Sequence, residues 1–333
     1  MRIAKWDNVK FVLIYSVVLG HFARAMKTDS SLINGLHVFI YTFHMPAFFF
    51  ISGLFAKRSI REKRYEKALA FLMLYIFMKT FKYLCNIYIY GKLGNYHILI
   101  ENGVPWFALV LFFYYLITMV IRRWDAKYVM IAACILGMMI GYDTDMGNTL
   151  AAMRMITFYP FFVLGYFLPV KKVQNFVEKR YVRILSILIL VVFAVFCIKY
   201  LDRVYPWLEF LKCKAPYESL KLLPYGGIYR GIYYIAAMIL TLALIAAVPS
   251  GNMFFSAWGK RTIQVFALHE IVMNVLLKKV HLKQFLINLW PAHYGLLVPV
   301  VALAVTVVLS WKGLEPFFAG LMNPVGKSDK RSE

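Results

Sequence analysis

The sequence is poor in charged side chains, because only 16% of its 333 residues are Asp, Glu, Lys or Arg. A water-soluble domain carries about 25%. Acidic residues are scarcest, with 16 Asp and Glu against 38 Lys and Arg. Apolar residues make up 62% of the chain instead, and they recur in runs long enough to cross a bilayer core of about 30 Å. No stretch remains for a long soluble domain, which excludes the soluble enzyme classes.

Cysteine and the common cofactor motifs are also scarce. The four cysteines lie far apart without a CxxC pair, so neither a zinc site nor a disulfide framework is indicated. The P-loop, the Rossmann glycine pattern, HExxH and GxSxG are absent, and we expect no metal cofactor. The net charge of +22 comes from Lys and Arg clustered in short loops between apolar runs. This distribution is typical of the cytoplasmic side of a membrane protein, and we expect no nucleic-acid partner.

The apolar runs predict an all-α, polytopic membrane bundle of about ten transmembrane helices. Lys and Arg are more frequent on one set of alternate loops, which places both termini in the cytoplasm of a multi-pass protein of the cell membrane. A cleavable signal at the N-terminus is the alternative, but charges crowd its apolar run. Residues 1–322 are expected to form a single transmembrane domain and 323–333 a disordered cytoplasmic tail. The spans are 8–26, 33–56, 67–90, 106–122, 127–142, 153–169, 183–201, 226–249, 261–279 and 293–312.

The first predicted span carries an unusual polar face. At about 100° per residue, the eleven steps from Lys10 to His21 leave the two side chains about 20° apart and about 16 Å apart along the axis. Asp7 and Arg24 lie near the same face, and Asp7 can pair with Lys10 at i, i+3. Ionisable groups in a span indicate function. The alternative is that the charges snorkel to the interface and His21 makes an interhelical hydrogen bond.

The second span adds another histidine, His44, in the half that lies level with His21. Pro46 removes one helical hydrogen bond, and Ser52-Gly53 permits the close approach of a backbone or ligand. The two imidazoles are expected to face one cavity. An unperturbed imidazole titrates near pH 6.5, so it can take a proton from a hydroxyl and return it.

Later spans contribute weaker candidates. Arg154 begins a span from the outer side, where it either binds an anionic group or anchors the helix at the interface. His269 and Glu270 lie within a span and could pair with a cation such as Arg230. Lys79 and Lys82, inside the third span, either line a substrate cavity or form interhelical pairs.

Lys10, ten intervening residues and His21 resemble the Arg/Lys-x10-His motif of the acyltransferase-3 family of membrane O-acyltransferases. The similarity extends over most of the chain, although the later signatures are degenerate. Position 10 departs mildly from the family, since Lys replaces the commoner Arg and weakens any bidentate phosphate contact. The further similar segments are Trp6-Asp7, Val17-Val18-Leu19-Gly20-His21, His44-Met45-Pro46, Phe48-Phe49-Phe50, Ser52-Gly53, Trp106-Phe107, Phe158-Tyr159-Pro160, Gly165 and Leu268-His269.

The resemblance implies transfer of an acetyl or other short acyl group from acyl-CoA to a carbohydrate hydroxyl of a cell-surface or lipid-linked glycan. His21 would act as general base or carry the acyl group transiently. Asp7 and Lys10 would organise the donor end, and His44 would assist proton movement or position the substrate. The remaining candidates for substrate binding are Arg24, Ser52, Trp106, Arg154, His269 and Glu270.

Three other functions remain open from the sequence. A glycosyltransferase using a lipid-linked sugar would rely on Asp143 and Asp145 to hold a divalent cation. A transporter or flippase would use the intramembrane charges as a path, although no internal repeat is visible. A non-catalytic membrane subunit would tolerate the loss of both His21 and His44.

Overall fold

The computed structural model describes residues 4–28, 30–93, 96–101, 103–146 and 149–323. These residues form helices joined by short connections, and no strand occurs among them apart from an isolated bridge between Ile100 and Thr149. The predicted all-α class is confirmed. Of the expected tail, residues 324–333 lie outside the described part of the chain.

Each of the ten predicted segments contains a helix. These are α1 (Ala4–Met26), α2 (Ser31–Arg61), α3 (Tyr65–Tyr90), α4 (Trp106–Ile121), α5 (Ala126–Met139), α6 (Ala152–Phe167), α8 (Arg180–Lys199), α11 (Gly226–Ala247), α12 (Thr262–Lys278) and α14 (Val298–Leu309). Shorter helices complete the described fold, namely α7 (Val170–Val177), α9 (Leu201–Val204), α10 (Leu208–Leu211), α13 (Leu282–Leu289) and α15 (Glu315–Leu321).

The described helices support a membrane protein but not the count of ten spans. Five of them, α1, α2, α3, α8 and α11, are long and apolar enough to cross a bilayer. The count rises to seven if α6 with α7, bent by 94°, and α13 with the helix after it, bent by 119°, each form one span. The 14 residues of α5 extend about 21 Å, short of a core of about 30 Å. The count of ten and the orientation therefore stay predictions.

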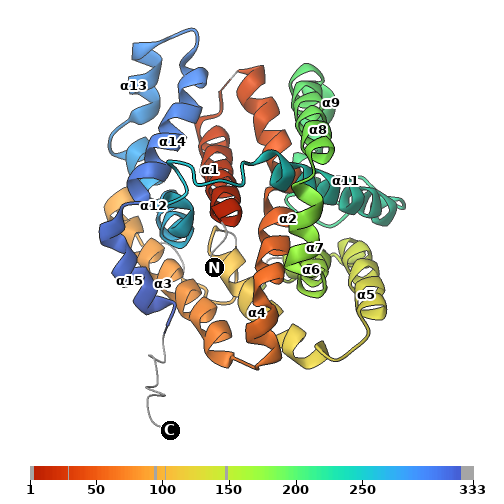
Figure 1. The fold of residues 1–333 in the computed structure, drawn as a ribbon. Helices are drawn as coiled ribbons and strands as arrows, with labels where there is room; N and C mark the ends of the chain where they lie inside the picture. Colours follow the sequence, from red (N-terminus) through yellow and green to blue (C-terminus); the bar gives the residue numbers. More distant parts are fainter. Residues whose placement is uncertain (1–3, 29, 94–95, 102, 147–148, 324–333) are drawn as a thin grey trace.

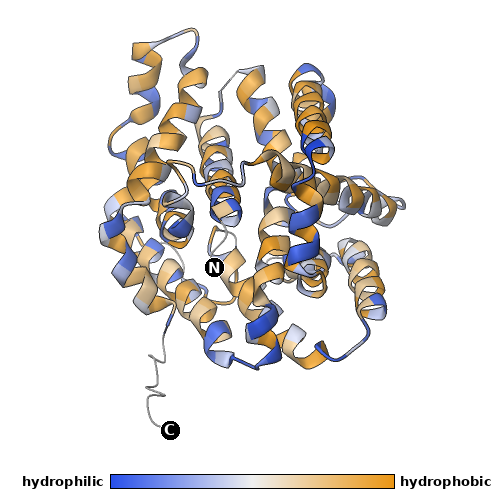
Figure 2. Cartoon of the chain, viewed as in Figure 1, coloured by the Kyte–Doolittle hydropathy of each residue, from blue (hydrophilic) through white to orange (hydrophobic). Residues whose placement is uncertain are grey.

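Polar and apolar residues are distributed over the surface as a membrane protein requires. Figure 2 shows apolar residues over most of the outward-facing helices and hydrophilic residues in the turns at the lower edge, where α2 meets α3 and α4 meets α5. The peripheral helix α8 exposes a run of large apolar side chains that includes Ile184, Leu188, Val192 and Val195. Such a face is stable in lipid and unfavourable in water.

Helices α1 and α2 lie at the centre of the bundle (Figure 1). Helix α2 crosses α6 at two glycines. A methyl group on Gly53 would lie 2.0 Å from the carbonyl oxygen of Phe162, and one on Gly165 would lie 2.1 Å from that of Phe50. The two backbones therefore touch, which confirms the close approach predicted at Ser52-Gly53.

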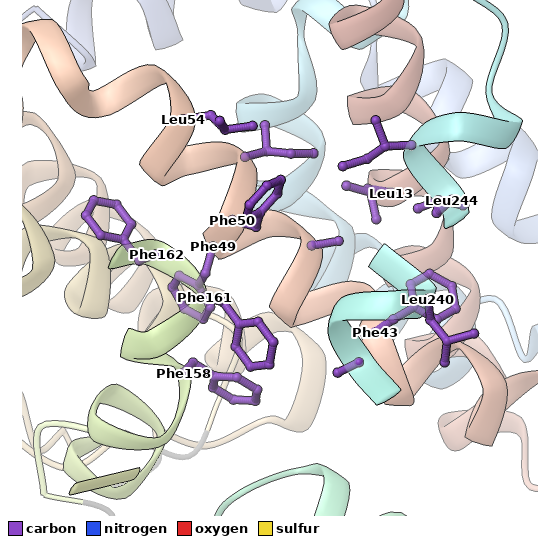
Figure 3. Packing of buried hydrophobic residues seen from close by; sticks show 14 of the residues in the cluster. Leu13, Phe43, Phe49, Phe50, Leu54, Phe158, Phe161, Phe162, Leu240 and Leu244 are labelled. Atoms are coloured by element: carbon purple, nitrogen blue, oxygen red, sulfur yellow. The ribbon is translucent and has the colours of Figure 1, made fainter. Parts of the chain in front are cut away.

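Aromatic packing fixes α2 against α6 on one side of this crossing. Phe49 of α2 stacks on Phe158 of α6 at 5.6 Å between ring centroids and contacts Tyr114 of α4 at 5.1 Å. Figure 3 shows Phe49 and Phe50 on α2 beside Phe158, Phe161 and Phe162 on α6. Because His44 lies little more than one helical turn before Phe49, this packing also fixes its position.

The connection between α11 and α12 holds the N-terminal end of α1. The Lys5 ammonium donates to the carbonyl of Val248 at 2.8 Å, and the Asn8 amide donates to the carbonyls of Pro249 and Gly251 at 3.0 and 2.9 Å. A methyl group on Gly259 would lie 1.8 Å from the Asp7 carbonyl oxygen. These contacts bring the turn that ends at Lys260 against the start of α1.

Candidate active site

A cavity of about 900 Å³ runs along the polar face of α1. From α1 it is lined by Lys10, Ile14, Val17, His21 and Arg24, which are spaced three or four residues apart, and by the adjacent Ala25. The helical arithmetic is therefore confirmed for Lys10, His21 and Arg24, and the fourteen residue steps from Lys10 to Arg24 extend about 21 Å along the helix. The predicted site residues His44, Ser52, Trp106, Arg154 and Glu270 line the same cavity.

The cavity has two cationic ends. The Lys10 end is formed by Lys10 and Lys260, with Ser52 of α2 nearby in the lining. The Arg24 end is formed by Arg24, Lys27, Arg154, Lys212 and Lys214. The charges of Arg154, Arg24 and Lys212 all act on Lys214, which places these groups together. His21 lies on α1 between the two ends.

The Lys10 end is organised by an ion pair. The Lys10 ammonium lies 2.8 Å from Oδ1 of Asp7, whose side chain is 3% exposed. Asp7 is not among the lining residues. It therefore holds Lys10 from behind, as the i, i+3 spacing predicts.

His21 is backed by a second histidine, His269 of α12. The two ring centroids are 5.1 Å apart with the planes tilted by 58°. Nδ1 of His269 lies 3.0 Å from the carbonyl oxygens of Val265 and Phe266, and because a carbonyl only accepts, Nδ1 carries the proton. Nε2 is then a lone-pair acceptor, and it is buried without a hydrogen-bond partner. His269 does not line the cavity, so it lies behind His21.

His44 also has its tautomer fixed by the backbone. Its Nδ1 lies 2.8 Å from the carbonyl oxygen of Ile40, so Nδ1 donates and Nε2 is left as an acceptor. The ring of Tyr41 lies 4.8 Å from that of His44, and both residues line the cavity. The cavity wall near His21 thus presents a nitrogen able to accept a hydrogen bond from a hydroxyl.

Glu270 pairs with Lys82 across α12 and α3, with 2.7 Å between Nζ and Oε1. The predicted pairing of Glu270 with Arg230 is therefore wrong. Arg230 lies on α11, donates to the Phe210 carbonyl at 3.1 Å and stacks on the Phe210 ring at 3.8 Å. The sequence could not decide between the two cations, because both pairings join residues far apart in the chain.

Arg154 lies in the cavity wall. Its guanidinium is 4.4 Å from the centre of the Trp106 ring and donates to the Glu101 carbonyl at 2.6 Å. The residue is 3% exposed, which is too buried for an interfacial anchor. Glu101, in the connection before α4, pairs with Lys79 of α3 at 3.0 Å. Lys82 both forms the interhelical pair with Glu270 and lines the cavity.

Sequence reasoning missed several lining residues, namely Lys27, Tyr41, Lys212, Lys214 and Lys260. Their only local signal is charge or an aromatic ring, which the sequence contains many times. Lys27 directly follows α1 and Tyr41 lies on α2, whereas Lys212, Lys214 and Lys260 reach the cavity through long-range packing of the connections after α10 and α11. No spacing rule along the chain gives that packing.

The acidic loop after α5 has a local role. Oδ1 of Asp143 accepts the backbone N–H groups of Asp145 and Met146 at 2.9 and 2.8 Å, which is a turn-forming arrangement. In the described part of the chain, no three His, Cys, Asp or Glu side chains are grouped so that they could hold a metal ion. Nothing in this geometry favours the metal-dependent glycosyltransferase.

Comparison with known proteins gives one match. Searches among curated proteins and among solved structures each found none. A protein-family model described as an acyltransferase domain matches residues 3–311. That range is nearly the whole chain and contains the cavity, both of its ends and all four helices that carry the histidine and Lys82–Glu270 contacts. The chain therefore belongs to the acyltransferase-3 family of membrane acyltransferases.

Proposed function

We propose that the protein transfers an acetyl or other short acyl group from acyl-CoA to a carbohydrate hydroxyl of a cell-surface or lipid-linked glycan, in the cell membrane. The observation that carries this proposal is the single cavity that joins the Lys10 end to the Arg24 end past His21 and His44. Donor and acceptor can enter from opposite ends and meet beside an imidazole.

The donor enters at the Lys10 end. Lys10 and Lys260 line it, and ammonium groups bind the phosphates of coenzyme A as point charges. Because Asp7 holds the Lys10 ammonium at 2.8 Å, that charge stays in place when the site is empty. The pantetheine arm then extends along the α1 face and delivers the thioester carbon toward His21.

His21 acts as the general base. Its cavity-facing nitrogen takes the proton of the acceptor hydroxyl while the hydroxyl oxygen bonds to the acyl carbon. The carbon–sulfur bond then breaks, and the coenzyme A thiolate takes the proton back from the imidazolium. Neutral His21 is restored, and the products are the acyl ester and free coenzyme A.

His269 and His44 support this step without exchanging the acyl group. In the proposed step the Nε2 lone pair of His269, which has no hydrogen-bond partner in this structure, accepts an N–H from the neighbouring His21 ring once the acceptor is bound. This contact would fix which His21 nitrogen faces the cavity. A carboxylate does the same for the histidine of a catalytic triad. The Nε2 of His44 accepts a hydrogen bond from the acceptor and orients it. His269 is thus a positioning residue and His44 a substrate-binding one.

Mass spectrometry of glycans from cells that express the protein tests the proposal. The wild-type protein should add one acyl increment, and His21→Ala should abolish it at an unchanged protein level in the membrane. His293→Ala is the matched control, because His293 is exposed and outside the cavity. Acylation retained by His21→Ala would contradict the assignment. Movement of unmodified glycan across vesicles would indicate a transporter instead.

A further inference from the structure

The charge of the cavity lining is strongly one-sided. Among the described lining residues, eight are Lys or Arg and one, Glu270, is a carboxylate. That carboxylate is already paired with Lys82 at 2.7 Å. A cavity that serves only a neutral sugar does not need this excess, because like charges in a partly buried site repel one another.

Most of the excess lies at the Arg24 end, away from the predicted donor entrance. Its cations come from three parts of the chain, with Arg24 and Lys27 at the end of α1, Arg154 on α6, and Lys212 and Lys214 after α10. Lys212 pairs with Glu209 at 2.6 Å. Arg154 donates to a backbone carbonyl and packs on an indole ring. The nearby Glu101 carboxylate also acts on Arg154, but it is itself paired with Lys79.

The pKa of Lys214 reflects how close these cations lie to one another. Burial, followed by the charges of Arg154 and Arg24, lowers the pKa of Lys214 to about 8 against the opposing effect of the Glu101 carboxylate. Packing that holds cations this close to a buried lysine is typical of a binding site for an anion.

We propose that the Arg24 end of the cavity binds an anionic group of the acceptor, a phosphate or a carboxylate, so that the substrate is an anionic glycan. The inference rests on the proposed function, and it adds the chemical class of the acceptor and the residues that select it. Planar guanidinium groups and ammonium groups together suit the oxygens of either anion.

The position of His21 then sets where the acyl group goes. Arg24 follows His21 by three residues on α1, a spacing that places their Cβ atoms about 5–6 Å apart. The anionic group held by Arg24 and the hydroxyl that reacts at His21 are thus separated by about one sugar ring. The acyl group should be found on the sugar that carries the charge or on its direct neighbour.

Binding of inorganic pyrophosphate to the purified full-length protein in detergent micelles tests the site without using the reaction. The triple variant Arg24→Gln/Lys27→Gln/Lys214→Gln should raise the Kd at least tenfold, because charge-assisted contacts are lost. The matched control, Arg123→Gln/Lys171→Gln/Lys172→Gln, removes one Arg and two Lys that are exposed and outside the cavity. It should leave the Kd unchanged.

Two outcomes of this titration would overturn the inference. Equal weakening in both triple variants would show a general effect of net charge. Loss of binding in Lys10→Gln/Lys260→Gln, with full binding in the Arg24-end variant, would place the anion site at the donor end. Circular dichroism and thermal unfolding of each variant show whether it is folded, and a folded variant is required for the comparison.

The modified glycan gives the second test and separates the possible sources of the anion. NMR of the glycan should place the acyl ester within one sugar of a phosphate or carboxylate, and an ester in a wholly neutral glycan would overturn the inference.

Acylation in vesicles is then compared between polyprenyl-phosphate-linked glycan and the same glycan released by mild acid. Loss on release identifies the lipid phosphate, and retention identifies a charge on the sugar chain. If the wild-type protein adds no acyl group while pyrophosphate binding depends on Arg24, the proposed function fails and the anion site remains.

Discussion

Replacing His269 with Phe should lower kcat/KM for acyl transfer by roughly 10- to 150-fold while leaving the KM for acyl-CoA unchanged. Phe fills the ring volume but removes the Nε2 acceptor that lies behind His21. A hydrogen bond to a charged group contributes about 1.5–3 kcal/mol, and each 1.36 kcal/mol is a tenfold change in rate. The proposed donor contacts lie at the Lys10 end, about 16 Å along α1 from His21, and the substitution does not alter them.

The assay is release of free coenzyme A thiol by protein reconstituted in vesicles, with acceptor glycan from cells that lack the protein. His37→Phe is the matched control. His37 is also a buried histidine with unpartnered ring nitrogens, but it does not line the cavity and packs on Tyr41 rather than on His21. This control should stay within about threefold of wild type.

A third variant and a pH profile separate positioning from packing. His269→Gln places an amide oxygen near the position of Nε2, so it should recover much of the lost rate. The acidic limb of the kcat/KM profile, which reports the base, should move further in His269→Phe than in His37→Phe, because the His269 ring contacts His21. If His269→Phe loses no more activity than His37→Phe, or if its pH profile is unchanged, the positioning role of His269 is refuted.

The remaining predictions concern packing, charge and the reaction route. Gly53→Ala should lower the free energy of unfolding by about 1–3 kcal/mol or prevent folding, because its methyl group meets a carbonyl at 2.0 Å. Gly320→Ala, in α15 with nothing within 4 Å, should be neutral or stabilising by up to about 1 kcal/mol in the same detergent unfolding experiment. Lys260→Gln should raise the KM for acyl-CoA about threefold to tenfold without changing kcat, because its exposed ammonium contributes a screened contact. Sulfate, whose own charge is constant, should bind more weakly as the pH rises through about 8, because Lys214 loses its proton there, and Lys214→Arg should remove this dependence. The charged groups that act on Lys214 are Arg154, Arg24, Glu101 and Lys212. Protein quenched after mixing with acyl-CoA alone should carry no covalent acyl group by intact-mass analysis, and an accumulating adduct would show that the acyl group is carried by the enzyme.

The sequence predicted the elements well because each depends on local pattern. All ten apolar segments contain helices, and the angular arithmetic placed Lys10, His21 and Arg24 on one cavity face. The number of spans was less certain, since an apolar run such as α5 forms a helix shorter than the bilayer core. Whether a short helix spans, bends or ends inside the bundle is decided by its neighbours.

The predicted site was incomplete where it depended on tertiary pairing. The sequence marks His269 and Glu270 as costly residues in a span, but it does not show that one backs His21 and the other binds Lys82. Lys214 and its neighbours lie in a connection with no motif of their own. Their role follows only from the packing of that connection over the end of α1.

The cavity bears on how the donor reaches the acceptor. Lys10 and His21 are about 16 Å apart along α1, a separation that would require a relay if the two ends were closed from one another. One cavity includes both, so an extended pantetheine arm can bring the thioester to His21 directly. The two histidines among the described lining residues, His21 and His44, both lie toward the Arg24 end. A relay would need an activated nucleophile at the Lys10 end, where the described lining offers the hydroxyls of Ser52 and Thr262 without an imidazole beside them. Direct attack of the acceptor hydroxyl on acyl-CoA is therefore the route that this arrangement favours.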